Sequence, residues 1–274
     1  MATPADQVAD QATEDEVIFD VSDHIATITI NRPDAQNTIS GPMLAALSEY
    51  MLKADADPEV RAMIITAAGR FFCAGLDLRG GGIASGLSNQ NSGNNDLDLR
   101  NTPPTVLHNL DTPTICALNG SAAGYGMDLA LGCDIRLMAD NAKLAAAFTA
   151  RGVVPESGGT WILPRLLGWS KAAEIIFTGR TLLADECESL GLISKVVPAD
   201  QIGEAARNLA LEIASNAPMA VQASKRMMRM GMNETFNDHV HHVYLQLLPL
   251  FRSEDFKEGM TAFMEKRKAE FKGR

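Results

Sequence analysis

The sequence has few of the features that mark secreted, membrane-spanning or metal-binding proteins. Its four cysteines, Cys73, Cys116, Cys133 and Cys187, lie far apart and form no C-x-x-C pair or other metal-ligand spacing. Isolated cysteines in apolar surroundings are typical of buried thiols in a reducing compartment. No apolar run reaches the ~18 residues that a membrane-spanning helix requires. We therefore expect a protein without disulfides or membrane spans.

Positive charge is also scarce, since 24 Lys and Arg residues stand against 34 Asp and Glu residues, for a formal net charge of −10. Such a chain offers no broad basic surface for a phosphate backbone, so nucleic acid is not an expected partner. A few clustered cations can still bind a small anionic ligand. Residues 1–16 are acidic and lack the parts of a signal peptide, which predicts a cytoplasmic protein with a flexible tail over residues 1–14.

Three common catalytic signatures are missing from the sequence: the nucleophile elbow G-x-S-x-G, the Walker loop and G-x-G-x-x-G. Their absence argues against a serine hydrolase, a P-loop enzyme and a dinucleotide-binding enzyme. His239, His241 and His242 cluster, but on a helix only 239 and 242 share a face. Without a third ligand they are expected to be packing or solvated histidines rather than a metal site.

What the sequence does contain is an alternation of strand and helix patterns. Residues 16–30 read as an antiparallel hairpin, 43–53 as a helix and 60–66 as a buried strand, which is the rhythm of an α/β fold. The segment 80–101 is rich in Gly, Ser and Asn and predicts a loop or lid. Further predicted elements are strands at 114–118 and 134–138, helices at 124–131 and 155–167, and C-terminal helices at 200–216, 218–230, 234–248 and 253–270.

Three ordered stretches carry a family signature. They are FCAGLDL (72–78), NGSAAGYGMDLA running on to CDIR (119–136), and PESGGT followed by LPR (155–165). With the ending EGMTAFMEKR (258–267), they resemble the crotonases, the enoyl-CoA hydratase/isomerase superfamily, over about residues 16–274. The resemblance implies a crotonase-like α/β spiral of ββα units, with an acyl-CoA-binding core at 15–198. Residues 199–274 would form a helical trimerisation region, giving a homotrimer or hexamer.

The glycine turns fit thioester chemistry. Reaction next to a thioester places negative charge on the carbonyl oxygen, and fixed N–H donors stabilise that charge. The resemblance implies that the backbone N–H groups of Leu76 and Tyr125 are these donors. The family usually has glycine where Tyr125 stands, and we expect Gly124 and Gly126 to keep the turn flexible.

The acids depart from the hydratase pattern. Typical hydratases have glutamates at the positions of Asp128 and Phe148, so the second acid is missing here. Glu156 stands where peroxisomal-type enoyl-CoA isomerases have their catalytic glutamate. The resemblance therefore implies that Glu156 is catalytic and Asp128 is a second acid. We expect an apolar wall of Phe148, Trp161 and Leu76 to bury Glu156 and raise its pKa. An acid at a helix start is also stabilised by the helix dipole, whatever its function.

The resemblance also implies the contacts to substrate and coenzyme A, which are Arg70, Ala74, Arg79, Gly124, Phe148, Phe263 and Lys266. Lys266 would reach the coenzyme A of a neighbouring subunit. No metal and no permanently bound cofactor are expected, because coenzyme A enters as part of the thioester substrate.

The predicted activity is double-bond isomerisation of an unsaturated acyl-CoA in fatty acid metabolism, with Glu156 carrying the proton. An enoyl-CoA hydratase that uses Asp128 together with Glu156 is the main alternative. Two others stay open: an aryl-CoA dehalogenase in which Glu156 is the nucleophile, and a non-catalytic acyl-CoA binder.

Overall fold

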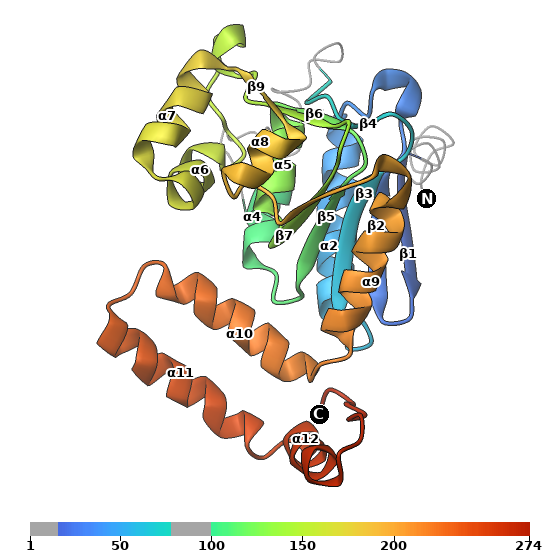
Figure 1. Ribbon diagram of the computed structural model, residues 1–274, viewed down its shortest axis with the longest axis vertical. Helices are drawn as coiled ribbons and strands as arrows, with labels where there is room; N and C mark the ends of the chain where they lie inside the picture. The colour runs from blue at the N-terminus through green and yellow to red at the C-terminus, as the bar shows by residue number, and fades with distance from the viewer. Residues whose placement is uncertain (1–15, 78–99) are drawn as a thin grey trace, which may run out of the picture.

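The computed structural model describes residues 16–77 and 100–274, with a six-stranded sheet at its centre (Figure 1). The strands follow the order β1-β2-β3-β5-β7-β10. The first two form the predicted antiparallel hairpin, which is confirmed, and the later neighbours pair in parallel. The bounds are Val17–Ser22, Ile25–Ile30, Ala62–Ala67, Thr114–Leu118, Ile135–Ala139 and Lys195–Val197.

Both faces of this sheet are buried, as expected for parallel strands covered by helices. Side chains of β3 alternate between the faces. Met63 and Ile65 join the main core, which also contains buried residues of α2 (Gly41–Ala56), whereas Ile64 packs in a second core with residues of α9 (Ile202–Ala214). The α/β layering that the sequence predicts is therefore present.

A second, four-stranded sheet was not predicted from the sequence. Its order is β4-β6-β8-β9, in which β8 and β9 are antiparallel and the other pairs are parallel. Each strand has three residues, too few to produce a recognisable alternation of apolar and polar side chains. The bounds are Phe71–Cys73, Ser121–Ala123, Lys143–Ala145 and Thr181–Leu183.

Five short helices join the strands of the two sheets: α4 (Pro103–Asn109), α5 (Tyr125–Gly132), α6 (Gly159–Leu167), α7 (Trp169–Thr178) and α8 (Ala184–Ser189). The prediction of a helix from residue 155 is wrong in its first turn. Residues 156–158 form a turn, and α6 begins after Gly158, whose φ of 103° is not helical.

The C-terminal quarter is helical, as predicted. After α9 come α10 (Pro218–Gly231), α11 (Phe236–Leu250) and α12 (Glu254–Glu265), which lie below the rest of the chain in Figure 1. Within the described residues, no helix is long and apolar enough to cross a bilayer. The predicted tail (1–14) and nearly all of the predicted loop (80–101) fall outside the described residues.

Candidate active site

The second sheet meets α5 at a turn that depends on two glycines. Gly124 has φ 54° and ψ −124°, a conformation that residues with a side chain avoid. Gly126 approaches β4 so closely that a Cβ atom there would lie 2.2 Å from the carbonyl oxygen of Cys73. The expectation that these glycines make the turn flexible is therefore wrong. They fix the start of α5 against the end of β4.

This close approach brings Leu76 and Tyr125 to one pocket. Leu76 forms a parallel bridge with Ile39, in which Gly75 accepts from the Ile39 N–H and Asp77 donates to the Ile39 carbonyl, each at 2.9 Å. Because successive backbone groups alternate in direction, the Leu76 N–H points away from Ile39. Among the described residues, neither this N–H nor that of Tyr125 donates to a backbone carbonyl. Within residues 16–77 and 100–274, the predicted donors are thus both without a backbone acceptor.

Asp128 lies one turn into α5 and is 2% exposed. Its carboxylate accepts a hydrogen bond of 3.1 Å from the N–H of Gly159, the first residue of α6. Burial raises the pKa of Asp128 to about 7, against the lowering effect of the Gly159 hydrogen bond, and the nearby Glu156 carboxylate adds to the increase. Asp128 therefore joins the two helices and titrates close to neutral pH.

Glu156 stands in the turn before α6 and also lines the pocket. Its side chain is exposed, so the expected burial of Glu156 is wrong for this chain by itself. The hydroxyl of Ser157, which is buried, lies 3.5 Å from one Glu156 carboxylate oxygen. Asp128 is therefore buried, while Glu156 is exposed and lines the cavity.

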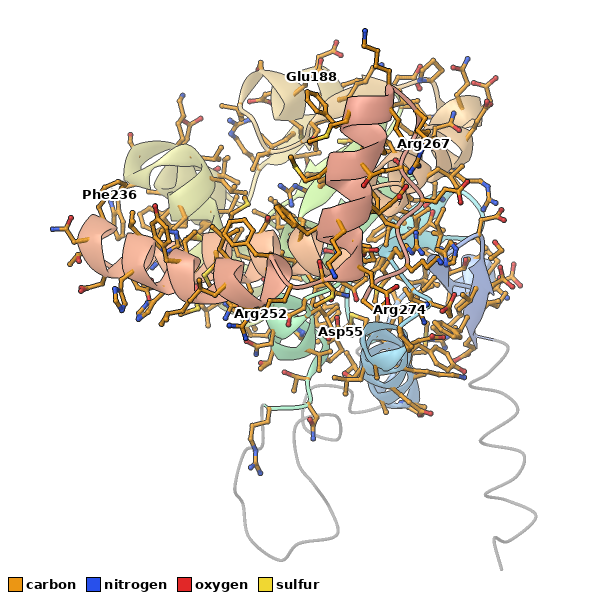
Figure 2. All side chains as sticks on the ribbon, turned by 90° about the horizontal axis from the view of Figure 1, so that it is seen from below. Asp55, Glu188, Phe236, Arg252, Arg267 and Arg274 are labelled. Atoms are coloured by element: carbon orange, nitrogen blue, oxygen red, sulfur yellow. The ribbon has the colours of Figure 1, made fainter. Side chains whose placement is uncertain are left out.

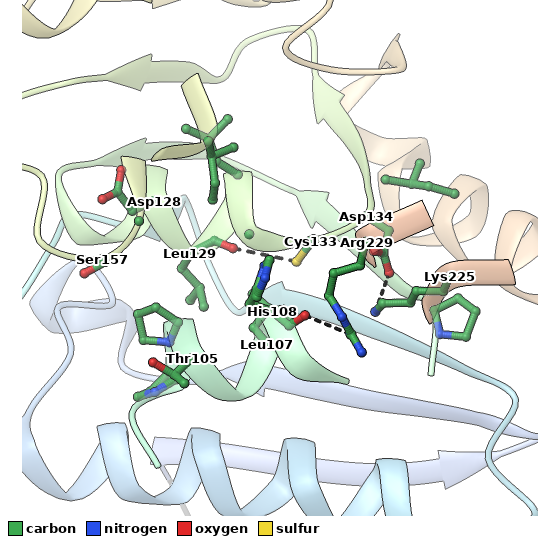
Figure 3. Close-up of a pocket in the computed structure, with 18 of the residues that line it drawn as sticks. Thr105, Leu107, His108, Asp128, Leu129, Cys133, Asp134, Ser157, Lys225 and Arg229 are labelled. Carbon is green, nitrogen blue, oxygen red and sulfur yellow. Dashed lines mark hydrogen bonds and ion pairs between the residues drawn. The ribbon is translucent and has the colours of Figure 1, made fainter. Parts of the chain in front are cut away.

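The pocket that contains these groups has a volume of about 1890 Å³. One end holds Leu76, Tyr125, Asp128 and Glu156, and the cavity continues past α4 to side chains of α10. Figure 3 shows Asp128 and Ser157 on one side of the view, His108 in the middle and Lys225 and Arg229 on the other side. This volume exceeds the ~300–1,000 Å³ of common ligand sites, so it has room for an extended ligand.

Comparison with known proteins identifies the family to which this site belongs. A family model described as enoyl-CoA hydratase/isomerase matches residues 20–274. The chain belongs to this family. The crotonase is 36% identical over 262 residues to the short-chain-enoyl-CoA hydratase of Clostridium acetobutylicum, covering 94% of this chain and 98% of that protein. It is 33% identical over 260 residues to the 1,2-epoxyphenylacetyl-CoA isomerase of Escherichia coli, with the same coverage.

Solved structures agree with this assignment. The crystal structure of an enoyl-CoA hydratase from Mycobacterium marinum matches with a TM-score of 0.86 and 32% identity, covering 95% of this chain and all of that one. The predicted family and the crotonase fold are therefore confirmed, and the chain is an enzyme of that family. Relatives with hydratase and isomerase names occur at similar identity, so the family alone does not decide the reaction.

Among the residues that the structure describes, the others predicted to contact the substrate and coenzyme A do not line the pocket together with the two acids. Phe148 is buried, and its ring comes within 3.9 Å of the position that a Cβ on Gly124 would take. Arg70 is exposed with its guanidinium 5.4 Å from the Phe71 ring, and Ala74 follows β4 directly. Arg79 lies outside the described residues.

Two predicted contacts belong to α12 and do not line the pocket described here. Phe263 is 82% exposed, and Lys266 ends the helix with φ 55°. Their assignment to a neighbouring subunit's coenzyme A stays a prediction.

Several residues of the crotonase pocket were missed from the sequence. Ser157 contacts Glu156 from a turn that was predicted as helix, and Gly159, the first residue of α6, donates to Asp128. His108, Lys225 and Arg229 come from α4 and α10, and nothing in their spacing connects segments over a hundred residues apart.

Two residues of the histidine cluster, His239 and His242, contact the side chain of Glu234. The Nδ1 atoms of His239 and His242 lie 3.2 and 2.9 Å from the Glu234 carboxylate. Across residues 16–77 and 100–274, no group of three or more His, Cys, Asp or Glu side chains is arranged to hold a metal ion.

Proposed function

We propose that this crotonase isomerises the double bond of a 3-enoyl-CoA or a related unsaturated substrate. Glu156 removes the proton from the alpha carbon, and the electrons spread over the thioester and the neighbouring double bond as a dienolate. The N–H groups of Leu76 and Tyr125 stabilise the charge on the thioester oxygen. Glu156, whose carboxyl proton can exchange with solvent because the side chain is exposed, then delivers a proton to the gamma carbon, so one acid performs both transfers.

The observation that carries this proposal is the side chain at position 148. Phe148 is buried beside Gly124, where the family resemblance puts the second glutamate of a hydratase. A phenyl ring there cannot activate a water molecule for addition. The acids that line the same end of the pocket are Asp128 and Glu156, the pair expected of an isomerase.

The different surroundings of the two acids suit this division of work. A proton shuttle must reach two carbons of the substrate, and an exposed glutamate in a turn has the freedom to do so. Asp128 is held by the Gly159 N–H, so we assign it a positioning role. Its hydrogen bond fixes the start of α6 and, through Gly159, the turn that carries Glu156.

Hydration of a 2-enoyl-CoA is the second candidate. It is favoured by the pKa of Asp128, about 7, which allows this acid to accept or donate a proton near neutral pH. Asp128 and Glu156 could then divide water activation and proton delivery. A relative named short-chain-enoyl-CoA hydratase, at 36% identity, points the same way.

Replacement of the shuttle separates these candidates. Glu156→Gln should keep acyl-CoA affinity and lower isomerase turnover by at least ~10²-fold, the usual size of a general-base contribution. Wild type incubated with a 2-enoyl-CoA in heavy water should exchange label and equilibrate with the 3-enoyl form. Chromatography of the thioesters and calorimetric binding provide the two measurements.

Two results would contradict the isomerase. Rapid accumulation of hydroxyacyl-CoA would establish the hydratase, in which Asp128→Asn should be as damaging as Glu156→Gln. Full activity of Glu156→Gln would make this acid a structural charge. A protein that binds every thioester, with a raised melting temperature but no turnover, would be a non-catalytic binder.

We also propose that residues 199–274 assemble the chain into a trimer or a hexamer of two trimers. None of the fifteen residues of α11 is buried, even though several of them are large and apolar. The side chains of Phe236, Tyr244 and Leu248 are 79%, 62% and 54% exposed. Figure 2 labels Phe236 at one end of this helix. A large exposed apolar surface marks a protein contact. In such an assembly Phe263 and Lys266 would contact the coenzyme A of a neighbour, and light scattering that reports a stable monomer would refute this arrangement.

A further inference from the structure

The far end of the pocket, where α10 meets α4 and β7, carries more positive than negative charge. The charged side chains that line this end are Arg136, Lys225, Arg229 and Asp134. Among the described residues that line this end of the pocket, three cations therefore stand against one carboxylate. Figure 3 shows Lys225, Arg229 and Asp134 grouped on the side of the view away from Asp128. We call this group the cationic end.

Among the described residues, Arg136 is the one cation of this end that has no ion pair with a carboxylate. It is 7% exposed, and its guanidinium donates to the carbonyl oxygens of Leu192 at 2.6 Å, Leu131 at 3.2 Å and Cys133. Within the described chain, no carboxylate forms an ion pair with it. Neutral carbonyls solvate a guanidinium but do not cancel its charge, so its field extends into the cavity.

Lys225 and Arg229 share their counterions with other groups. Lys225 Nζ lies 2.7 Å from an Asp134 oxygen that also accepts two hydrogen bonds from Thr114. Arg229 lies 3.3 Å from Asp111, which Arg226 approaches more closely, at 2.7 Å. Lys225 also donates to the Thr112 carbonyl at 2.8 Å, and Arg229 donates to the His108 and Leu110 carbonyls, each at 3.0 Å. These contacts dock α10, and because the carbonyls are neutral they leave the positive charge at this end in excess.

The pKa of His108 is affected by the positive charge at this end of the pocket. The His108 ring packs edge-on against Trp161 with 5.2 Å between centroids, and it lines the cavity between the two ends. Burial lowers the pKa of His108, and Arg229 and Lys225 lower it further, against the opposing effect of Asp134. A neutral imidazole offers one N–H donor toward the cavity.

We infer that the crotonase takes acyl-CoA substrates whose acyl chain ends in a carboxylate, which the cationic end binds. This inference rests on the proposed function, because it assigns the far end of the pocket to the acyl group. The thioester would lie at Leu76 and Tyr125, and the acyl chain would run past His108 toward Lys225. An anion at this end could also be a phosphate of coenzyme A, and the test separates the two sources.

The test compares matched pairs of 3-enoyl-CoA substrates of increasing chain length, one member ending in a methyl group and the other in a carboxylate. Wild type should prefer the carboxylate by about tenfold or more in kcat/KM at the best length. Lys225→Met should reduce this preference to near unity, and Lys225→Arg should retain most of it. Formation of the conjugated thioester is followed by absorbance.

Arg226→Met is the matched control. It removes one positive charge from the same helix together with an ion pair, to Asp111 where Lys225 pairs with Asp134, but Arg226 does not line the pocket. It should leave the preference for the carboxylate unchanged. An equal loss in both variants would mean that only the docking of α10 matters, and would overturn the inference.

Pantetheine thioesters, which lack the nucleotide phosphates, identify the anion. The preference for a carboxylate should persist with them, and its dependence on Lys225 should persist too. If the effect of Lys225→Met disappears with pantetheine, the cationic end binds coenzyme A and the inference is wrong. If wild type turns over both members of every pair equally, the inference fails while the isomerase stands. Absence of any turnover would instead reject the proposed function.

Discussion

The first turn of α5 and the turn before α6 each supply one acid to the same pocket, but they are built differently. Asp128 is 2% exposed and fixed by the Gly159 N–H, in a helix whose start is held against β4 by Gly126. Glu156 is exposed and lies outside regular structure. Burial perturbs the pKa of the first acid, whereas accessibility gives the second one freedom to move. The comparison suggests that the rigid acid organises the site and the exposed acid reacts.

The packing of α5 against β4 can be tested by a substitution at Gly126. Gly126→Ala would push a methyl group into the Cys73 carbonyl, where only 2.2 Å is available, so the start of α5 must shift. We expect a loss of ~10²-fold or more in kcat, the effect of removing one oxyanion donor, because the Tyr125 N–H moves with the turn. Gly203→Ala, at a glycine of α9 with open space around it and no positive φ, serves as the control, with nearly unchanged turnover. Steady-state kinetics would show the difference, and equal activity of both variants would refute the fixed turn.

The role of burial can be measured at Asp128. Its pKa is raised above the unfolded value, so the native state retains a proton that the unfolded chain releases. The stability associated with this proton is complete below about pH 4 and is lost as the pH rises toward 7. Asp128→Asn, which resembles the protonated acid, should therefore match wild type near pH 4 and become more stable above pH 7, by up to a few kcal/mol.

Denaturant unfolding over this pH range provides the measurement for Asp128. A stability difference that does not change with pH would contradict the raised pKa. The same variant should reduce turnover less than Glu156→Gln, because asparagine can still accept the Gly159 hydrogen bond.

A smaller effect is expected at the Tyr125 hydroxyl. This oxygen is buried and has no hydrogen-bond partner among the described residues. Tyr125→Phe keeps the backbone N–H and removes the unsatisfied group, so it should leave turnover nearly unchanged and raise the free energy of unfolding by ~1 kcal/mol. A destabilised variant, seen as a lower melting temperature, would show that the hydroxyl has a partner in solution.

Local patterns of apolar and polar residues in the sequence were sufficient to predict many of the strands and helices. The hairpin of β1 and β2 and the helices α9, α10 and α11 lie close to the expected spans, because each is long enough to display its period. The strand β5 was recognised instead from a continuous apolar run, and α12 ends at Glu265, before the expected end at residue 270. The three-residue strands of the second sheet lack that length. The start of α6 was misplaced because proline is common in a first helical turn, whereas here Gly158 delays the helix.

By itself, the sequence determined the family, the glycine turns and the identities of the two acids, since these are properties of short ordered motifs. Only the tertiary structure decided which acid is buried and what stands at the far end of the pocket. Burial depends on neighbours that are distant in the chain: Gly159 meets Asp128, and Lys225 reaches Asp134 across about ninety residues. A pKa and a local electric field are sums over such neighbours, and no local motif contains them.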